Sequence, residues 1–219
     1  MRIIDDFVSN GHGSLSPSYI VIHETANPGA TAKNHRDYWA RDDTYAVHYV
    51  GDWTGVIYHC VPDNRLCWQV GNGNPYVVGI ELCHATNQSD FNKVWNLGVE
   101  WAAMMLTRYG WGIDRLISHN DCTNWWGGSD HTDPLGYFNE YGKSWAQFKN
   151  EVDKYMGGEM LTKEDANTIW AFDNWGDQKG KSGNAWCNLM DTNRRIQAVE
   201  KNVSTLNSKL DKIIKKLGA

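Results

Sequence analysis

The chain has 219 residues and a formal net charge of −5, because 26 acidic side chains exceed 21 basic ones. This length predicts one domain, or one domain with a small appendage. With 41% hydrophobic and 21% charged residues, the composition predicts a packed core and excludes a disordered or collagen-like chain. The acidic balance argues against a generally basic nucleic-acid-binding protein, and we expect no nucleic-acid partner.

Twelve tryptophans and five cysteines are unusual features of this composition. An odd number of cysteines excludes a fully paired disulfide framework within one chain, so we expect reduced thiols. Tryptophans suit a core, but also a groove that binds carbohydrate or peptide. No signal-peptide-like segment begins the chain, and no apolar run is long enough to span a bilayer, so we expect no membrane insertion.

Short apolar strands alternate with amphipathic helices over the first part of the chain. The patterns predict strands at 19–23, 46–50, 56–60, 77–83 and 116–119, and helices that begin at Thr31, at Ser89 or Asp90 and at Ser144. This alternation predicts an α/β fold in which a central mixed β-sheet is flanked by helices. We expect that domain to span residues 1–157.

One predicted strand, 77–83, carries a carboxylate within an apolar run. Its alternation places Val78, Ile80 and Leu82 on one face and Glu81 on the other. A charge in the middle of a strand costs free energy unless it is partnered or functional. Glu81 is therefore a candidate functional residue, and the alternative is an inward charge paired with an arginine or lysine.

The remainder of the chain has a different pattern. Residues 158–192 predict a small module of helix and loop. In 193–219, apolar residues recur at alternating spacings of three and four: Ile196, Val199, Val203, Leu206, Leu210, Ile213 and Leu217. This heptad pattern favours a C-terminal coiled-coil helix and a homo-oligomer, whereas a single amphipathic helix packed on its own domain is the alternative.

Two histidines, His23 and His119, end predicted strands, and Asp133 lies further along the chain. Side chains at the carboxyl ends of strands face the edge of a sheet where ligands usually bind. Hydrolytic zinc sites use three nitrogen, oxygen or sulfur ligands and leave one position for water. These three residues are therefore the best metal candidates, although their spacing forms no local zinc motif.

Several ordered blocks of the sequence resemble one enzyme family. The segment 22–35 (IHETANPGATAKNH) is similar to the opening of the zinc-dependent N-acetylmuramoyl-L-alanine amidases of type 2. Phage endolysins and peptidoglycan recognition proteins share that domain. The later matching blocks are 47–50, 59–64 with Trp68, 79–82, 118–121 and 131–134. The resemblance covers roughly residues 17 to 155 and identifies 1–157 as the catalytic domain.

The resemblance implies roles for individual residues. It makes His23, His119 and Asp133 the ligands of Zn²⁺ and Glu81 the catalytic glutamate. It also gives His131 a catalytic role as a donor to the developing oxyanion, at a position where many members have lysine. The candidate substrate-binding residues are His48, His59, Trp68 and Trp126.

The chain departs from the family pattern at several positions. Many relatives use cysteine where this chain has Asp133, and Cys122 is a rival ligand close to His119. The residues 123–130 form an extended loop that we expect to wall the substrate groove. Gln69 stands where the family tends to have histidine, and Val47 where some members have tyrosine.

The resemblance implies a peptidoglycan hydrolase that cleaves the amide between N-acetylmuramic acid and L-alanine with zinc-activated water. The alternative is a non-catalytic peptidoglycan-binding module that is oligomerised by its coiled coil. An enzyme is favoured because all three ligand positions and the glutamate are filled. Without a signal peptide, we expect an endolysin that stays in the host bacterial cytoplasm until holin-mediated release and then acts on the cell wall.

Overall fold

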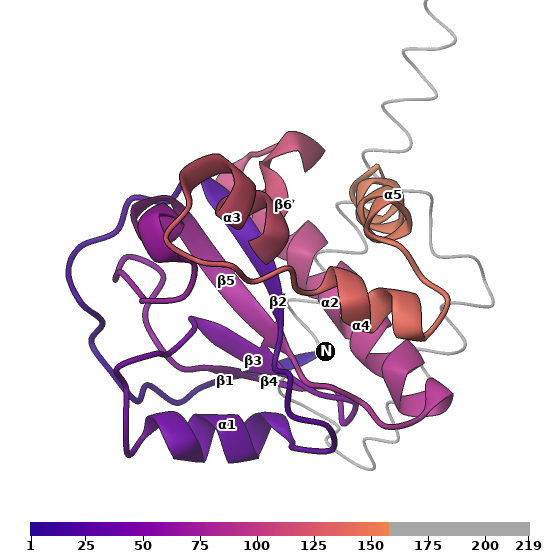
Figure 1. Cartoon of the computed structure of the whole chain (residues 1–219), viewed down its shortest axis with the longest axis horizontal. Helices are drawn as coiled ribbons and strands as arrows, with labels where there is room; N and C mark the ends of the chain where they lie inside the picture. Colours follow the sequence, from indigo (N-terminus) through magenta and orange to yellow (C-terminus); the bar gives the residue numbers. More distant parts are fainter. Residues whose placement is uncertain (158–219) are drawn as a thin grey trace, which may run out of the picture. The chain divides into compact units, whose positions relative to one another are not determined.

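The computed structural model describes residues 1–157, which form an α/β domain around one six-stranded sheet (Figure 1). The strands are β1 Arg2–Asp5, β2 Tyr19–Glu24, β3 Tyr49–Gly51, β4 Val56–His59, β5 Val77–Leu82 and β6 Leu116–Ser118. Their order across the sheet is β1-β4-β3-β5-β2-β6, and only β3 and β4 pair in antiparallel fashion. The prediction of a mixed sheet flanked by helices is confirmed.

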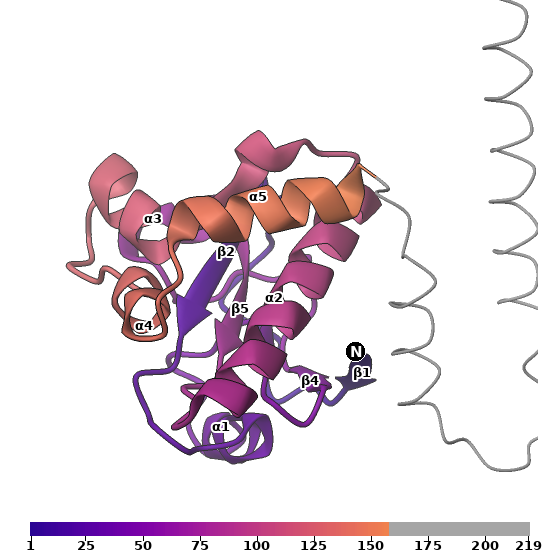
Figure 2. The same cartoon turned by 90° about the vertical axis from the view of Figure 1, so that its right-hand side faces the viewer.

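Helices cover both faces of this sheet. They are α1 Ala32–Trp39, α2 Gln88–Tyr109, α3 His119–Trp126, α4 Leu135–Glu140 and α5 Trp145–Met156, with short 3₁₀ helices η1 Gly71–Tyr76 and η2 Ile113–Arg115. Figure 2 shows α2 and α5 crossing on the same side of the sheet. The main core lies on that side, where Ile20, Ile22 and Ile80 pack with residues of α2 and α5.

The opposite face of the sheet has smaller clusters. Val21, Val77 and Ile117 pack with Cys122 beneath α3, and a separate apolar cluster lies at α1. Because side chains alternate along a strand, Tyr19, Val21 and His23 share this face of β2. The predicted alternation of side chains along the strand 77–83 is also observed. Val78, Ile80 and Leu82 belong to the main core, and Glu81 does not.

The helix termini follow the predicted signals with one shift. Thr31 and Ser144 cap α1 and α5 through capping boxes, and Gly110 ends α2 with a φ of 67°, a conformation that favours glycine. Asn87, rather than Ser89 or Asp90, caps α2, because its side-chain oxygen accepts a hydrogen bond from the Asp90 backbone N–H.

Three predictions need correction. The predicted strand 116–119 ends at Ser118, and His119 begins the helix α3 instead. The segment 123–130 is not a continuous loop, because α3 extends to Trp126 and only the residues after it form a loop. The predicted strand 46–50 is shorter, since β3 begins at Tyr49.

The predictions for the segments 158–192 and 193–219 concern residues outside those that the structure describes. Among the helices of residues 1–157, none combines the length and the apolar character that a membrane crossing requires.

Candidate metal centre

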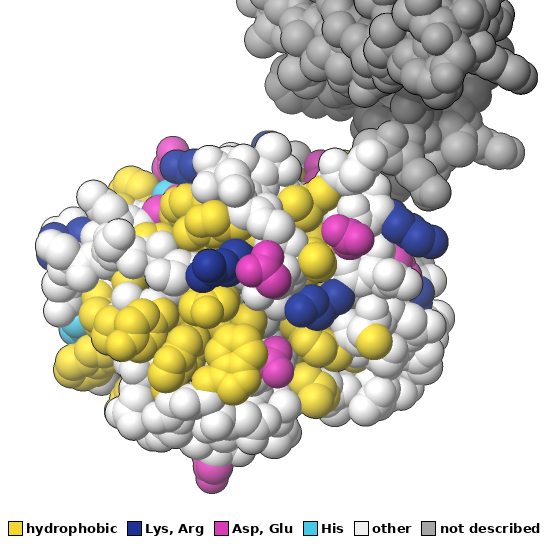
Figure 3. All heavy atoms as spheres, turned by 90° about the horizontal axis from the view of Figure 1, so that it is seen from above, with side chains coloured by type: hydrophobic (Ala, Val, Ile, Leu, Met, Phe, Trp, Pro, Cys, Tyr) yellow, Lys and Arg dark blue, Asp and Glu magenta, His cyan; other side chains and the backbone are white. Residues whose placement is uncertain are grey.

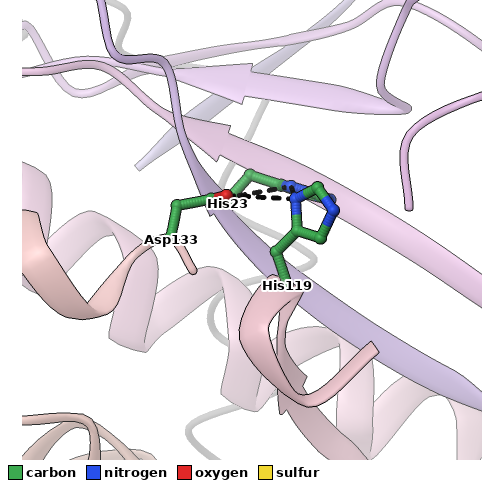
Figure 4. Close-up of side chains that lie close together, drawn as sticks. All are labelled: His23, His119 and Asp133. Carbon is green, nitrogen blue, oxygen red and sulfur yellow. Dashed lines mark hydrogen bonds and ion pairs between the residues drawn. The ribbon is translucent and has the colours of Figure 1, made fainter. Parts of the chain in front are cut away.

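Three side chains that are distant in the sequence meet near the carboxyl end of β2 (Figure 4). His23 lies in β2, His119 is the first residue of α3, and Asp133 precedes α4. The two histidine Nδ1 atoms are 3.0 Å apart, and they lie 3.3 and 3.1 Å from the carboxylate oxygens of Asp133. The structure therefore brings the three predicted metal ligands together.

A capping box places His119 at this position. The Ser118 side chain accepts a hydrogen bond from the Asp121 backbone N–H, and the Asp121 carboxylate accepts one from the Ser118 N–H. This reciprocal pair ends β6 and begins α3 within one residue. As a result, the imidazole of His119 is directed from the first turn of the helix toward His23.

The donor set and its spacing fit a divalent cation such as zinc. A tetrahedral site with metal–ligand bonds of about 2.0–2.2 Å places its ligand atoms about 3.3–3.5 Å apart. The two Nδ1 atoms are 3.0 Å apart, and each lies near a different Asp133 oxygen, His119 at 3.1 Å from Oδ1 and His23 at 3.3 Å from Oδ2. One ligand atom from each residue lies within 4.8 Å of the other two, close enough for all three to bind one cation. If both Nδ1 atoms carried a proton, the two N–H groups would point at each other and repel. With both nitrogens deprotonated, a cation can bind between them.

The protonation states also suit metal binding. Burial alone would raise the pKa of Asp133, but the imidazoles of His119 and His23, at 3.1 and 3.3 Å, outweigh it, so the pKa lies well below its ordinary value. Burial lowers the pKa of His23, which favours the neutral ring. A carboxylate and a neutral imidazole are the forms that bind a metal. The Glu24 backbone N–H donates to Asp133 Oδ2 at 3.2 Å and helps to fix it.

Glu81 is the neighbour of His23 in the parallel register of β5 and β2, so both side chains lie on the same face. Its Oε2 atom is buried and has no hydrogen-bond partner in the described part of the chain. Burial raises the pKa of Glu81 well above its usual range, and the carboxylates of Asp133 and Glu24 add to this shift. The alternative of an ion pair with lysine or arginine finds no support within residues 1–157.

His131 lies beside the three candidate ligands and is open to solvent. Its side chain is 66% exposed, its Nδ1 lies 3.7 Å from Asp133 Oδ1, and its ring centroid lies 4.8 Å from that of His119. This position allows the imidazole to reach a substrate bound at the centre.

Ser129 contacts the centre, although sequence analysis treated it only as part of a loop. Its Oγ lies 3.0 Å from Nε2 of His119 and also accepts a hydrogen bond from the His131 backbone N–H at 3.3 Å. If Nε2 of His119 carries the proton and donates to Ser129, Nδ1 is left free to bind a cation. A serine in a polar loop gives no sequence signal of such a contact.

Glu24 and His84 form a second contact that sequence analysis missed. A carboxylate oxygen of Glu24 lies 2.7 Å from Nδ1 of His84, whose Nε2 lies 3.4 Å from Glu140. The position of Glu24 directly after His23 was the available signal, because neighbours of a metal ligand often orient the site.

Cys122 is not part of the centre. Its side chain belongs to the apolar cluster beneath α3, and burial raises the pKa of its thiol to about 12. The four cysteines within the described residues, Cys60, Cys67, Cys83 and Cys122, are all free thiols. Asp133 rather than Cys122 therefore completes the cluster with the two histidines.

Neither His48 nor His59 makes a hydrogen bond or ion pair with the three clustered side chains within residues 1–157. His48 is fully buried, its Nε2 donates to the Arg65 carbonyl at 2.8 Å, and its Nδ1 accepts from the Gly79 N–H at 3.2 Å. Burial lowers the pKa of His48 to about 4. His59 lies on β4, three strands or about 14 Å from β2, and pairs with Asp5 and Asp63. Their contacts indicate structural roles.

The two predicted substrate-binding tryptophans occupy different places. Trp68 is 45% exposed and stacks on His12, with ring centroids 4.0 Å apart. Trp126 ends α3 and stacks on Tyr76 with a centroid distance of 5.1 Å. Trp126 is thus at the opposite end of the helix from His119.

Comparisons with known proteins agree with this geometry. A family described as N-acetylmuramoyl-L-alanine amidase (Amidase_2) matches residues 13–136. A bifunctional autolysin of Staphylococcus aureus is 30% identical over an alignment of 158 residues, which covers 67% of this chain and 12% of the autolysin. The chain therefore spans a small part of that relative's length.

Solved structures show the same fold. The Staphylococcus aureus hydrolase AmiA, crystallised with its ligand, is 26% identical with a TM-score of 0.67, and the match covers 73% of this chain and 85% of AmiA. A mutant endolysin from Bacillus subtilis is 26% identical with a TM-score of 0.57, over 69% of this chain and 98% of the endolysin. Both alignments cover most of the described residues.

Proposed function

This chain belongs to the N-acetylmuramoyl-L-alanine amidase family, and from this premise we propose that it hydrolyses the amide between N-acetylmuramic acid and the L-alanine of the peptidoglycan stem peptide. The observation that carries the proposal is the convergence of His23, His119 and Asp133 beside Glu81. A module that only binds peptidoglycan would not require this complete set of groups, so hydrolysis is the better explanation.

The three clustered residues are the proposed zinc ligands. His23 and His119 offer Nδ1 and Asp133 offers a carboxylate oxygen, and these ligand atoms lie within 4.8 Å of one another. The chemistry expected of Zn²⁺ at this position is Lewis-acid polarisation of the scissile carbonyl and activation of a water molecule.

Glu81 is the proposed general base and acid. Its carboxylate takes a proton from the attacking water, whose oxygen forms a bond to the carbonyl carbon, and passes the proton to the nitrogen as the C–N bond breaks. Because Oε2 has no partner among the described residues, it can accept this proton without losing a protein hydrogen bond. Burial and two nearby carboxylates raise the pKa of Glu81 from its ordinary value toward the operating pH, which suits a group that both takes up and returns a proton.

His131 is the proposed donor to the oxyanion. Its exposed imidazole lies next to Asp133 and can turn an N–H toward the substrate carbonyl oxygen. A donor aimed at the developing negative charge favours the transition state over the substrate.

Product analysis tests the reaction. The purified chain is incubated with cell-wall peptidoglycan, bound zinc is measured by atomic spectrometry, and the soluble products are identified by mass spectrometry. We expect bound zinc and free stem peptides that begin with L-alanine. New reducing sugars, or cleavage within the peptide, would contradict the proposal.

We also propose an endolysin that is retained in the host bacterial cytoplasm and released through a holin-made lesion. The similarity to a protein described as an endolysin from Bacillus subtilis supports the assignment to this class. Expression in a bacterial host with and without a holin tests it, because lysis should require the holin. The heptad pattern in 193–219 further supports a homo-oligomer, and sedimentation of the full chain should reveal a species larger than the monomer.

A further inference from the structure

A partly exposed cluster of aromatic rings lies on α3 and on the segments next to it, with Trp125 and Tyr76 exposed and Tyr19 and Trp126 partly buried. We call it the aromatic patch, and its members are Tyr19, Tyr76, Trp125 and Trp126. Trp125 is 54% exposed and Tyr76 is 43% exposed. Figure 3 shows the molecule from above, the side on which α3 and β6 lie, and hydrophobic side chains gather over much of that face. Exposed clusters of this kind often mark binding surfaces.

The patch and the metal centre occupy two ends of the same sheet face. Tyr19 and His23 lie on one side of β2, four residues apart, which corresponds to about 13 Å. Along α3, the distance from His119 to Trp126 is about 10 Å. A small substrate at the centre would not reach the patch, whereas a polymer that runs along α3 would contact both.

The rings pack against one another, and Tyr19 and Trp126 also pack against the apolar cluster beneath α3. Trp125 and Trp126 meet edge to face at 86°, and Tyr19 lies at 62° and 66° to them. The Asn72 side chain donates to the Trp126 carbonyl at 3.0 Å, which joins the end of α3 to η1. The patch is therefore a preformed surface and pays little conformational entropy when it binds.

The patch combines ring faces with unused hydrogen-bond donors. Among the hydrogen bonds within residues 1–157, none engages the indole N–H of Trp125 or Trp126 or the hydroxyl of Tyr76. Arg115, a cation beside the patch, lies 5.1 Å from the Tyr19 ring centroid and pairs with Asp114 at 3.3 Å. Its charge is thus partly balanced, which suits an uncharged ligand better than an anionic one.

We propose that the aromatic patch binds the glycan strand of peptidoglycan, as a surface separate from the metal centre. A saccharide ring offers C–H groups on its faces for stacking on aromatic rings and hydroxyl groups at its edge for the free N–H and O–H donors. The choice of glycan rests on the proposed function, because that substrate is a polymer long enough to lie along α3. The patch would hold the sugar strand while the amide lies at the centre.

Binding measurements test this proposal without any need for hydrolysis. The full chain carrying Glu81→Gln is titrated with a β-1,4-linked N-acetylglucosamine oligomer and, separately, with purified cell walls. Adding Trp125→Ala or Tyr76→Ala should weaken both interactions about fivefold or more, as expected for loss of an aromatic stacking contact. Trp125→Phe should restore most of the affinity, because it keeps a ring.

Tyr45→Ala is the matched control, since Tyr45 is an aromatic residue that is 73% exposed and lies outside the patch. Thermal melting shows whether each variant folds. Unchanged affinity of folded Trp125→Ala and Tyr76→Ala would overturn the proposal. It would also be overturned if these variants lost self-association of the chain but still bound the saccharide, because the patch would then contact a second copy of the chain. If the product assay on the unmutated active site fails while these titrations succeed, only the proposed function is contradicted.

Discussion

One face of the sheet packs into the main core, and the other face carries the candidate metal centre. On one face, Ile20 and Ile22 of β2 are sealed beneath α2 and α5 in the largest apolar cluster of the described residues. On the other, Tyr19, Val21 and His23 of the same strand face α3 and the metal centre. Because successive side chains of a strand point to opposite faces of the sheet, β2 alone contributes to both the apolar core and the candidate metal centre. We therefore expect substitutions on one face to alter folding, and substitutions on the other to alter metal binding and turnover.

The largest effect is expected from Asp133→Ala, which removes one of three clustered ligands. Zinc affinity should fall by more than about 100-fold, and activity should disappear. Loss of a residue that only hydrogen-bonds to a metal ligand already costs up to about 100-fold, and Asp133 is itself a proposed ligand. Chelator competition measures the affinity. Asp133→Cys is the control, because cysteine is also a zinc ligand, and it should retain bound zinc. Full activity of Asp133→Ala would exclude this residue as a ligand.

Glu81→Gln should lower activity by about 10²–10⁴-fold, the usual contribution of a general base, while bound zinc remains unchanged. The amide has nearly the same shape as the carboxylate but cannot take a proton from water. Folding should not suffer, because Oε2 has no partner to lose within residues 1–157. Turnover and metal content are measured on the same sample, and undiminished turnover would remove Glu81 from the mechanism.

Phe148→Ala probes the opposite face. Phe148 is fully buried on α5 and packs against Trp95 and Phe138. Its loss should reduce the free energy of unfolding by about 3–5 kcal/mol, measured by denaturant titration, with little change in the zinc affinity of the folded protein. Tyr155→Ala, on the exposed side of the same helix, should cost about 0.5 kcal/mol or less. Similar losses for both variants would contradict the proposed division.

The smallest effect is expected from Ser129→Ala, which removes the hydroxyl next to Nε2 of His119. Zinc affinity should fall by about 10–100-fold because the ring is less well oriented. Ser129→Thr keeps the hydroxyl and should restore most of the affinity. If the two variants bind zinc equally well, the contact does not orient the ligand.

Much of the fold follows from local patterns in the sequence. The alternation around Glu81 and the capping signals at Thr31 and Ser144 act within a few residues, so sequence analysis placed them correctly. The helix α3 was missed because His119–Trp126 is rich in asparagine, aspartate and threonine, which are weak helix formers. Its capping signal, Ser118 with Asp121, was present but is short.

The surroundings of the candidate site were harder to predict. The contacts of His48 with Arg65 and Gly79 depend on how separate segments pack, so a histidine that matched a family block could not be separated from a buried structural one. The contact of Ser129 with His119 likewise depends on the path of a loop. Tertiary packing decides both, and residue type alone does not.

Metal binding at the clustered His23, His119 and Asp133, as proposed, would also cross-link the fold. Two of the ligands are separated by 96 residues, so an unfolded chain would have to close a long loop to bring them together. A cation that binds only the folded arrangement stabilises it, by about 2.7 kcal/mol when its free concentration is 100 times the dissociation constant. Scarcity of metal would then lower both the active fraction of this protein and its resistance to unfolding.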